Sequence, residues 1–175
     1  MTNVRISRRL AGALIGVFGL IAAATATSAG QLASPTEKPI LTISGQIEST
    51  NKDGTAQFDR PMLEALGTVS IETTTPWYNG PVKFEGVSLD KLMKQVGAKG
   101  QRVVAIALND YSTEIPIEDF AKHGAILALK RNGEYMPVRD KGPLFIIYPF
   151  DSDPQLKSQT YYGRSAWQVA KLIVK

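Results

Sequence analysis

Hydrophobic residues recur along the chain in short alternating or apolar stretches that are separated by turn residues. Alternation with a period of two, or a short apolar run, predicts strands at 40–48, 68–75, 82–87, 102–108, 111–115, 125–130, 144–148 and 167–174. It predicts short helices at 59–66, 89–96 and 116–122. Many short strands with three short helices between them are typical of an α+β domain with mixed or antiparallel β-sheets.

Capping residues support the helices. Asp59 is predicted to cap the first helix, with Pro61 in its first turn, where a missing N–H costs little. Ser88 is predicted to cap the second helix. The third helix is expected to end at Gly124, which gives His123 a structural role as a cation near a helix C-terminus.

Turn signals and polarity define the connections. The sequence predicts turns at 53–54, 77–80 and 132–133, and a polar loop at 151–159. The strand at 102–108 is largely apolar, so it is expected to be buried on both faces.

The N-terminus has the three-part pattern of an export signal. Arg5, Arg8 and Arg9 precede an uncharged stretch at 10–26, and small residues follow at 27–29. Residues 1–29 are therefore predicted to be a signal peptide cleaved near Ala29, which makes the protein periplasmic or secreted. An uncleaved membrane anchor is the alternative, and the Arg8-Arg9 pair leaves general secretory and twin-arginine export both open.

The rest of the chain is predicted to be a flexible linker at 30–39 and one domain at 40–175. Removing residues 1–29 removes three arginines and no acid, so the net charge falls from +4 to +1. This balance argues against nucleic acid as a partner. No contact with a membrane is expected once the signal has been cleaved.

Composition excludes several kinds of chemistry. The chain has no cysteine, so it has no disulfide, no thiolate metal ligand and no thiol nucleophile. His123 is the one histidine, which excludes a zinc cluster built on several histidines. We therefore predict no metal site and no catalytic residues.

Five segments, in their order and spacing, resemble the sulfite-oxidase-type molybdopterin-binding domain family over residues 68–175. They are Phe84–Met93 followed by Gly97, Asn109–Ser112 followed by Ile115-Pro116, Ala125–Ala128 followed by Asn132-Gly133, Lys141–Leu144, and Ser165–Trp167. The resemblance implies that family's α+β fold.

The resemblance also implies a cysteine thiolate on molybdenum, at the end of the strand that corresponds here to 70–75. This chain has threonines at 73–75 instead, and a neutral hydroxyl is a poor substitute for a soft thiolate. The family's arginines hold the pterin phosphate and the anionic substrate, but Phe145 replaces one of them. Arg164 could supply charge nearby, although a lone arginine is more often a surface ion-pair partner.

These departures favour an exported binding module without molybdenum redox catalysis. Its partner would be a small molecule or a periplasmic protein, held by residues of the ancestral cleft. The candidates are Thr73, Thr74, Trp77, Tyr78, Asn109, Asp110, Tyr111, Lys141, Arg164 and Trp167.

Two alternatives stay open at this point. No cofactor is predicted, but molybdopterin is possible, and a molybdopterin-dependent oxidoreductase would then use Thr74 or water as a further metal ligand. The other alternative is metal-free hydrolysis by Asp110, Glu118 and Asp119, for which no activated nucleophile is visible.

Overall fold

The structure is a computed structural model that describes Met1 and residues 32–175. The predicted signal peptide, apart from Met1, lies outside the described residues. The ten strands are β1 (Leu41–Gly45), β2 (Ala56–Phe58), β3 (Val69–Thr75), β4 (Tyr78–Ser88), β5 (Arg102–Ala107), β6 (Ser112–Pro116), β7 (Ile126–Arg131), β8 (Glu134–Tyr135), β9 (Phe145–Ile147) and β10 (Val169–Val174). The helices are α1 (Arg60–Ala65), α2 (Leu89–Gln95), α3 (Glu118–His123) and α4 (Gln159–Arg164), with 3-10 turns at Val138–Asp140 and Pro154–Leu156.

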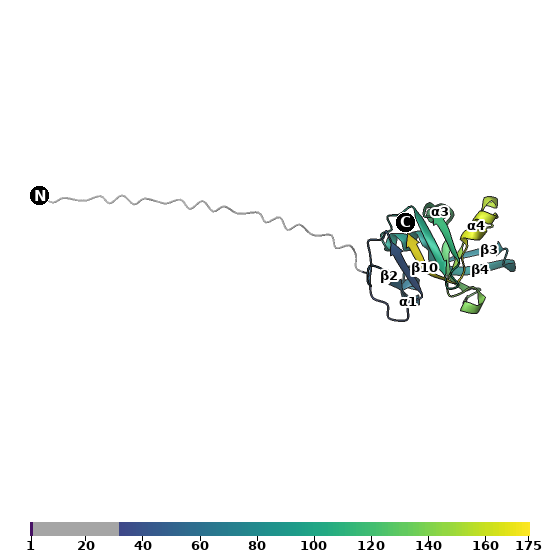
Figure 1. Cartoon of the computed structure of the whole chain (residues 1–175), viewed down its shortest axis with the longest axis horizontal. Coiled ribbons are helices and arrows are strands. Elements are labelled where there is room, and N and C mark those ends of the chain that lie inside the picture. The colour runs from purple at the N-terminus through teal and green to yellow at the C-terminus, as the bar shows by residue number, and fades with distance from the viewer. Residues whose placement is uncertain (2–31) are drawn as a thin grey trace.

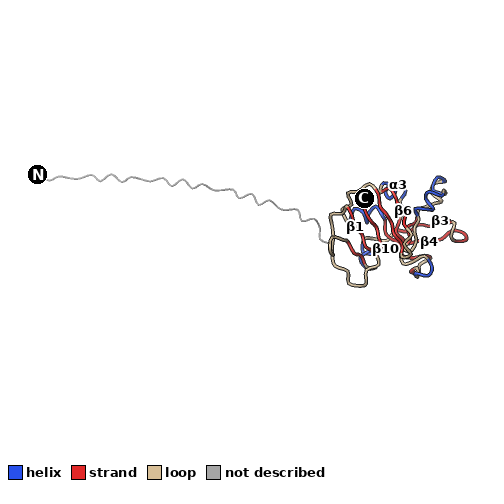
Figure 2. Tube along the Cα trace, viewed as in Figure 1, coloured by secondary structure: helices blue, strands red, loops and turns tan. Residues whose placement is uncertain are grey.

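The strands form two sheets, with short helices at their periphery (Figures 1 and 2). The first sheet has the order β2-β1-β10-β5-β6, and β1 pairs with β10 in parallel. The second sheet has the order β3-β4-β7-β8, and β9 also pairs with β7. All other strand pairs are antiparallel. The predicted α+β class with mixed sheets is therefore confirmed.

One hydrophobic core joins the two sheets. Leu41 and Val103 of the first sheet belong to the same buried cluster as Leu127 of the second sheet. A smaller cluster lies on the other face of β7, where Ile126 and Phe145 pack. Because side chains alternate between the faces of a strand, β7 is buried on both faces. The apolar sequence of β5 predicts burial on both faces of that strand too, and this prediction is wrong. Val103, Ala105 and Ala107 on one face are buried, whereas on the other face Arg102 is exposed and Val104 and Ile106 are half-buried.

The predicted helix caps are confirmed. The side chain of Asp59 accepts a hydrogen bond from the Met62 N–H, and that of Ser88 accepts one from the Lys91 N–H. Gly124 ends α3 in the left-handed conformation, with φ of 67°. This turn requires a positive φ, which glycine adopts without steric cost.

Asp59 also fixes the chain before β1. Its carboxylate accepts hydrogen bonds from the N–H groups of Thr36 and Glu37, at 2.6 and 2.8 Å. Leu32 is buried in the main core. The described part of the predicted linker, residues 32–39, therefore has no helix or strand but is packed against the domain.

Two local predictions need correction. The turn predicted at 77–80 consists of Pro76 and Trp77, because Tyr78 already pairs with Thr75 at the start of β4. The strand predicted at 82–87 is consequently the later part of the longer β4. The second correction is α4, which begins at the end of the predicted polar loop and is too short for a helical period to be visible in the sequence.

The pairing between β4 and β7 is irregular at one point, where β7 has one extra residue, Leu129. The register with β7 shifts between Glu85 and Gly86. A Cβ atom at Gly86 would collide with the backbone of Leu127 and Ala128. Glycine is thus required here because two strands approach closely.

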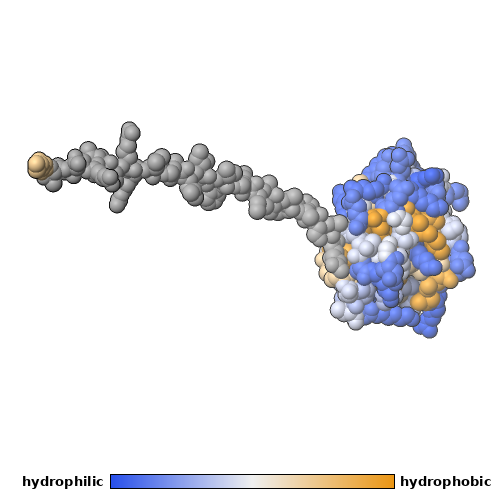
Figure 3. Space-filling model, turned by 60° about the vertical axis from the view of Figure 1, so that its left-hand side comes forward, coloured by the Kyte–Doolittle hydropathy of each residue, from blue (hydrophilic) through white to orange (hydrophobic). Residues whose placement is uncertain are grey.

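On the face shown in Figure 3, apolar side chains form limited patches between hydrophilic ones. Among the described residues, no helix has the length and hydropathy needed to cross a membrane.

Candidate functional site

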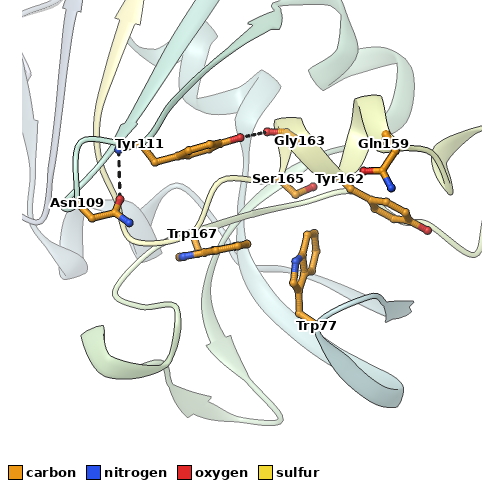
Figure 4. Close-up of a pocket in the computed structure, with 8 residues that line it drawn as sticks. All are labelled: Trp77, Asn109, Tyr111, Gln159, Tyr162, Gly163, Ser165 and Trp167. Carbon is orange, nitrogen blue, oxygen red and sulfur yellow. Dashed lines mark hydrogen bonds between the residues drawn. The ribbon is translucent and has the colours of Figure 1, made fainter.

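A cavity of about 320 Å³ lies where α4 meets three loops, and we call it the aromatic cleft (Figure 4). The loops are the β3–β4 turn, the β5–β6 turn and the segment that leads into β10. The cleft is lined by Trp77, Asn109, Tyr111, Gln159, Tyr162, Gly163, Ser165 and Trp167. Figure 1 shows α4 and the β3–β4 hairpin at the same end of the molecule, remote from β2.

Trp77 is the central ring of this region. Its indole makes edge-type contacts with Phe145 and Trp167, at centroid distances of 5.3 and 5.9 Å. It contacts Phe150 and Tyr162 in the same way, each at 6.1 Å. Edge-to-face pairs are the favoured arrangement of aromatic rings. Trp77 is therefore a fixed wall of the cleft.

The β5–β6 turn supplies a second wall. The Tyr111 hydroxyl donates a hydrogen bond to the Gly163 carbonyl at 2.9 Å, which ties this turn to α4. The Tyr111 N–H donates to Asn109 Oδ1 at 3.3 Å. Asp110 occupies the left-handed position of the turn, with φ of 63°, and does not line the cleft.

Trp167 lies opposite, just before β10. Its backbone forms a bridge with Phe145, and its ring packs on that side chain at 6.1 Å. About a third of its surface remains exposed. Lys141 does not line the cleft, because its Nζ lies over Tyr78, 4.8 Å from the ring centroid and 5.8 Å from that of Trp167.

Thr73 and Thr74 form a hydrogen-bonded bridge to Asp151. Both the N–H and the hydroxyl of Thr74 donate to the Asp151 carboxylate, at 2.5 and 2.6 Å. The buried Thr73 hydroxyl accepts from the Asp151 N–H at 3.0 Å. Lys157 adds an ion pair at 2.6 Å. Hydrogen bonds from Lys157 and then Thr74 hold the pKa of the Asp151 carboxyl well below its usual range.

Arg164 is committed to a buried carboxylate. Its guanidinium donates to Asp119 Oδ2 at 2.7 Å, and the Tyr148 hydroxyl donates to the same oxygen at 3.0 Å. Burial, together with the nearby Asp119 charge, raises the pKa of Tyr148. Arg164 is thus an ion-pair partner, but its partner is buried and not at the surface as expected, and Asp119 has a structural role.

The structure therefore brings together Trp77, Asn109, Tyr111 and Trp167 of the predicted site. It places Thr73, Thr74, Asp110, Lys141 and Arg164 outside the cleft lining. Sequence reasoning missed the contribution of α4, which is Gln159, Tyr162 and Gly163, and also missed the neighbouring Ser165. The available signal was the aromatic pair Tyr161-Tyr162, which follows a polar loop directly.

The donor set does not suit a molybdenum centre. Where the resemblance places a thiolate, the Thr74 hydroxyl is already bonded to Asp151. Where it places an arginine, Phe145 is fully buried against Trp77 and Trp167. Within residues 32–175, no group of three or more His, Cys, Asp or Glu side chains is arranged to hold a metal ion.

Comparison with known protein families supports the fold described above. The family model described as "Oxidoreductase molybdopterin binding domain" matches residues 41–150, which is more than half of the chain. No curated protein matches the sequence. The family match covers strands β1 to β9. It stops before α4 and before β10, which belongs to the first sheet. On this match, the chain belongs to the oxidoreductase molybdopterin-binding domain family, of the sulfite oxidase type.

Proposed function

We propose that this protein is an exported binding module that holds a small molecule in the aromatic cleft and does not catalyse molybdenum-dependent oxidation. The observation that carries the proposal is the cleft itself. It has aromatic walls and a few polar groups, which is the usual composition of a small-molecule site. Its aromatic walls are held by ring contacts and by the Tyr111–Gly163 hydrogen bond.

The chemistry of the family's metal position supports a binding role. Catalysis in the family requires a soft anionic ligand, and the chain has no cysteine to supply one. Thr74 and Asp151 instead join β3 to the loop after β9. A position that serves structure in this way is a poor candidate for a redox centre.

Export is part of the same proposal and rests on the sequence alone. Three arginines, an uncharged stretch and small residues at 27–29 have the order of a cleavable signal. The intact mass of the protein from its host checks this directly: cleavage near Ala29 predicts a chain beginning at about residue 30. Replacing Arg8-Arg9 by Lys-Lys distinguishes the two export routes, because twin-arginine export should be abolished.

A thermal-shift screen tests the binding role. The mature protein is heated with pterins, nucleotides and small anions, each at about a hundredfold excess over the Kd of interest. A ligand that binds only the folded state stabilises it by about 2.7 kcal/mol under these conditions, a shift of several degrees in Tm. A flat response across the panel would contradict ligand binding. It would favour docking of a protein partner, for which the exposed Leu108 and Val138 offer apolar surface near Trp167.

A further inference from the structure

Two rings of the aromatic cleft are arranged as a slot. Figure 4 shows the Tyr111 and Trp167 rings on opposite sides of the cavity with their faces turned toward each other. Trp77 stands roughly perpendicular to Trp167, with an interplanar angle of 74°, and closes one side. A flat group entering the cavity would therefore contact an aromatic face above and below. Flat conjugated rings gain most from this contact, because stacking uses both of their faces.

The edge of the slot carries neutral hydrogen-bonding groups. Asn109 and Gln159 present side-chain amides, each of which can donate and accept. Among the described residues, the amide nitrogen of Asn109 and the side chain of Gln159 have no hydrogen-bond partner within the chain. The Ser165 hydroxyl donates to the Tyr161 carbonyl at 2.9 Å and so remains available as an acceptor. Such groups suit the mixed donor and acceptor edge of a heteroaromatic ring.

The lining contains no charged side chain. The neighbouring cations are already paired: Arg164 binds Asp119, and Lys157, two residues before Gln159, binds Asp151. Lys141 Nζ lies 5.8 Å from the Trp167 centroid, but it is also 4.0 Å from the Asp140 carboxylate and 4.8 Å from the Tyr78 centroid. Phosphate recognition needs available cations or several backbone N–H groups. A neutral ligand therefore matches this cavity better than an anionic one.

The cleft is small, and its lining combines positions inside and beyond the family match, since Trp77, Asn109 and Tyr111 lie within residues 41–150. Gln159, Tyr162, Gly163, Ser165 and Trp167 all lie beyond residue 150, where the family match ends. A volume of about 320 Å³ is at the lower end for small-molecule sites, which suits one ring system.

From this geometry we infer that the aromatic cleft binds a flat, uncharged heteroaromatic ring that carries no phosphate group, inserted between Tyr111 and Trp167. The inference rests on the proposed binding function and specifies its ligand class. It differs from the phosphate-bearing pterin that the family's scaffold implies, because no free cation lines this slot.

Matched pairs of probes test the inference. Binding of riboflavin and FMN, and of guanosine and GMP, is measured by calorimetry and by quenching of flavin or tryptophan fluorescence, with glucose and choline as a sugar and a cation. We expect riboflavin or guanosine to bind, and its phosphorylated partner to bind no more tightly. The inference is overturned if FMN or GMP binds at least about tenfold more tightly, or if none of the neutral rings binds.

Variants at Tyr111 locate the binding. Tyr111→Leu removes one face of the slot and should weaken binding by about tenfold or more. Tyr111→Phe keeps the ring but loses the hydrogen bond to the Gly163 carbonyl, so it should weaken binding clearly less than Tyr111→Leu. Tyr135→Leu is the control, because Tyr135 is a similarly exposed ring that packs on Arg60 and Lys130 and does not line the cleft. Equal effects of Tyr111→Leu and Tyr135→Leu would contradict stacking in this slot.

The outcomes also separate this inference from the proposed function. Binding of glucose or choline alone, lost in Tyr111→Leu, would retain a ligand-binding module and overturn the ligand class. Absence of binding by every probe here and in the thermal-shift panel would overturn both.

Discussion

At the scale of single residues, side chains that looked suited to chemistry instead stabilise the fold. Arg164 and Asp119 are the clearest case, because the Asp119 side chain is only 7% exposed and accepts hydrogen bonds from both Arg164 and Tyr148. A buried carboxylate is tolerated only when its charge is compensated. The pair therefore anchors α4, and with it one wall of the aromatic cleft, to α3.

Removing the arginine tests this role. Arg164→Met leaves the Asp119 charge uncompensated in the interior, so we expect the free energy of unfolding to fall by about 3 kcal/mol. Urea unfolding followed by circular dichroism measures the loss. Arg102→Met is the matched control, since its pair with Glu114 is exposed and should contribute less than about 1 kcal/mol. Similar losses in the two variants would contradict a buried role for Arg164.

Asp151 gives a prediction about pH. Its pKa is lowered in the folded protein by hydrogen bonds from Lys157 and Thr74. The bridge therefore stabilises the fold above the unfolded-state pKa, which is about 3.9. That contribution is lost as the pH falls through the folded-state pKa. Asp151→Asn should therefore lower stability near neutral pH and flatten its decline below about pH 4.

Unfolding midpoints measured between pH 2 and 7 check this expectation. Asp153→Asn serves as the control, because Asp153 caps a short 3-10 turn and lies in the same loop without an ion pair to Lys157. If the stability of Asp151→Asn declined below about pH 4 as steeply as that of the unaltered protein, the bridge would not contribute to stability.

At the scale of elements, the sequence was most informative where local physics decides the outcome. Caps at Asp59 and Ser88 and the left-handed Gly124 could be predicted because each depends on a few neighbouring residues. The burial of β5 and β7 could not, because it depends on which strands become their neighbours and on what packs against each face. Helix α4 has only six residues and is held by the Arg164–Asp119 pair and by the hydrogen bond from Tyr111 to Gly163, both of which join residues remote in sequence.

Comparing the two helix caps tests how much stability Asp59 contributes by also binding the segment before β1. Ser88→Ala removes one capping bond and should cost about 1 kcal/mol. Asp59→Ala removes the equivalent bond and also leaves the N–H groups of Thr36 and Glu37 without their acceptor. We expect a loss of about 2 kcal/mol or more. Chemical denaturation measures both, and equal losses would mean that residues 32–39 are not held by Asp59.

At the scale of the whole molecule, the chain has the scaffold of its family but no cysteine for the metal position that the resemblance implies. The order of segments in the sequence was enough to predict the family and the fold, and the match over residues 41–150 confirms both. The candidate site was only half predictable. Trp77, Asn109, Tyr111 and Trp167 were recognised by residue type, but the α4 contribution depends on tertiary packing that the sequence does not display.

The central claim is that this scaffold binds a small molecule without a molybdenum centre. Native mass spectrometry of the protein purified from its own host tests it most directly, because one spectrum reports the chain and whatever it retains. We predict the mass of the mature chain, alone or with an organic molecule small enough for the aromatic cleft, and no molybdenum. A stoichiometric mass increment that contains molybdenum and its pterin would contradict the account.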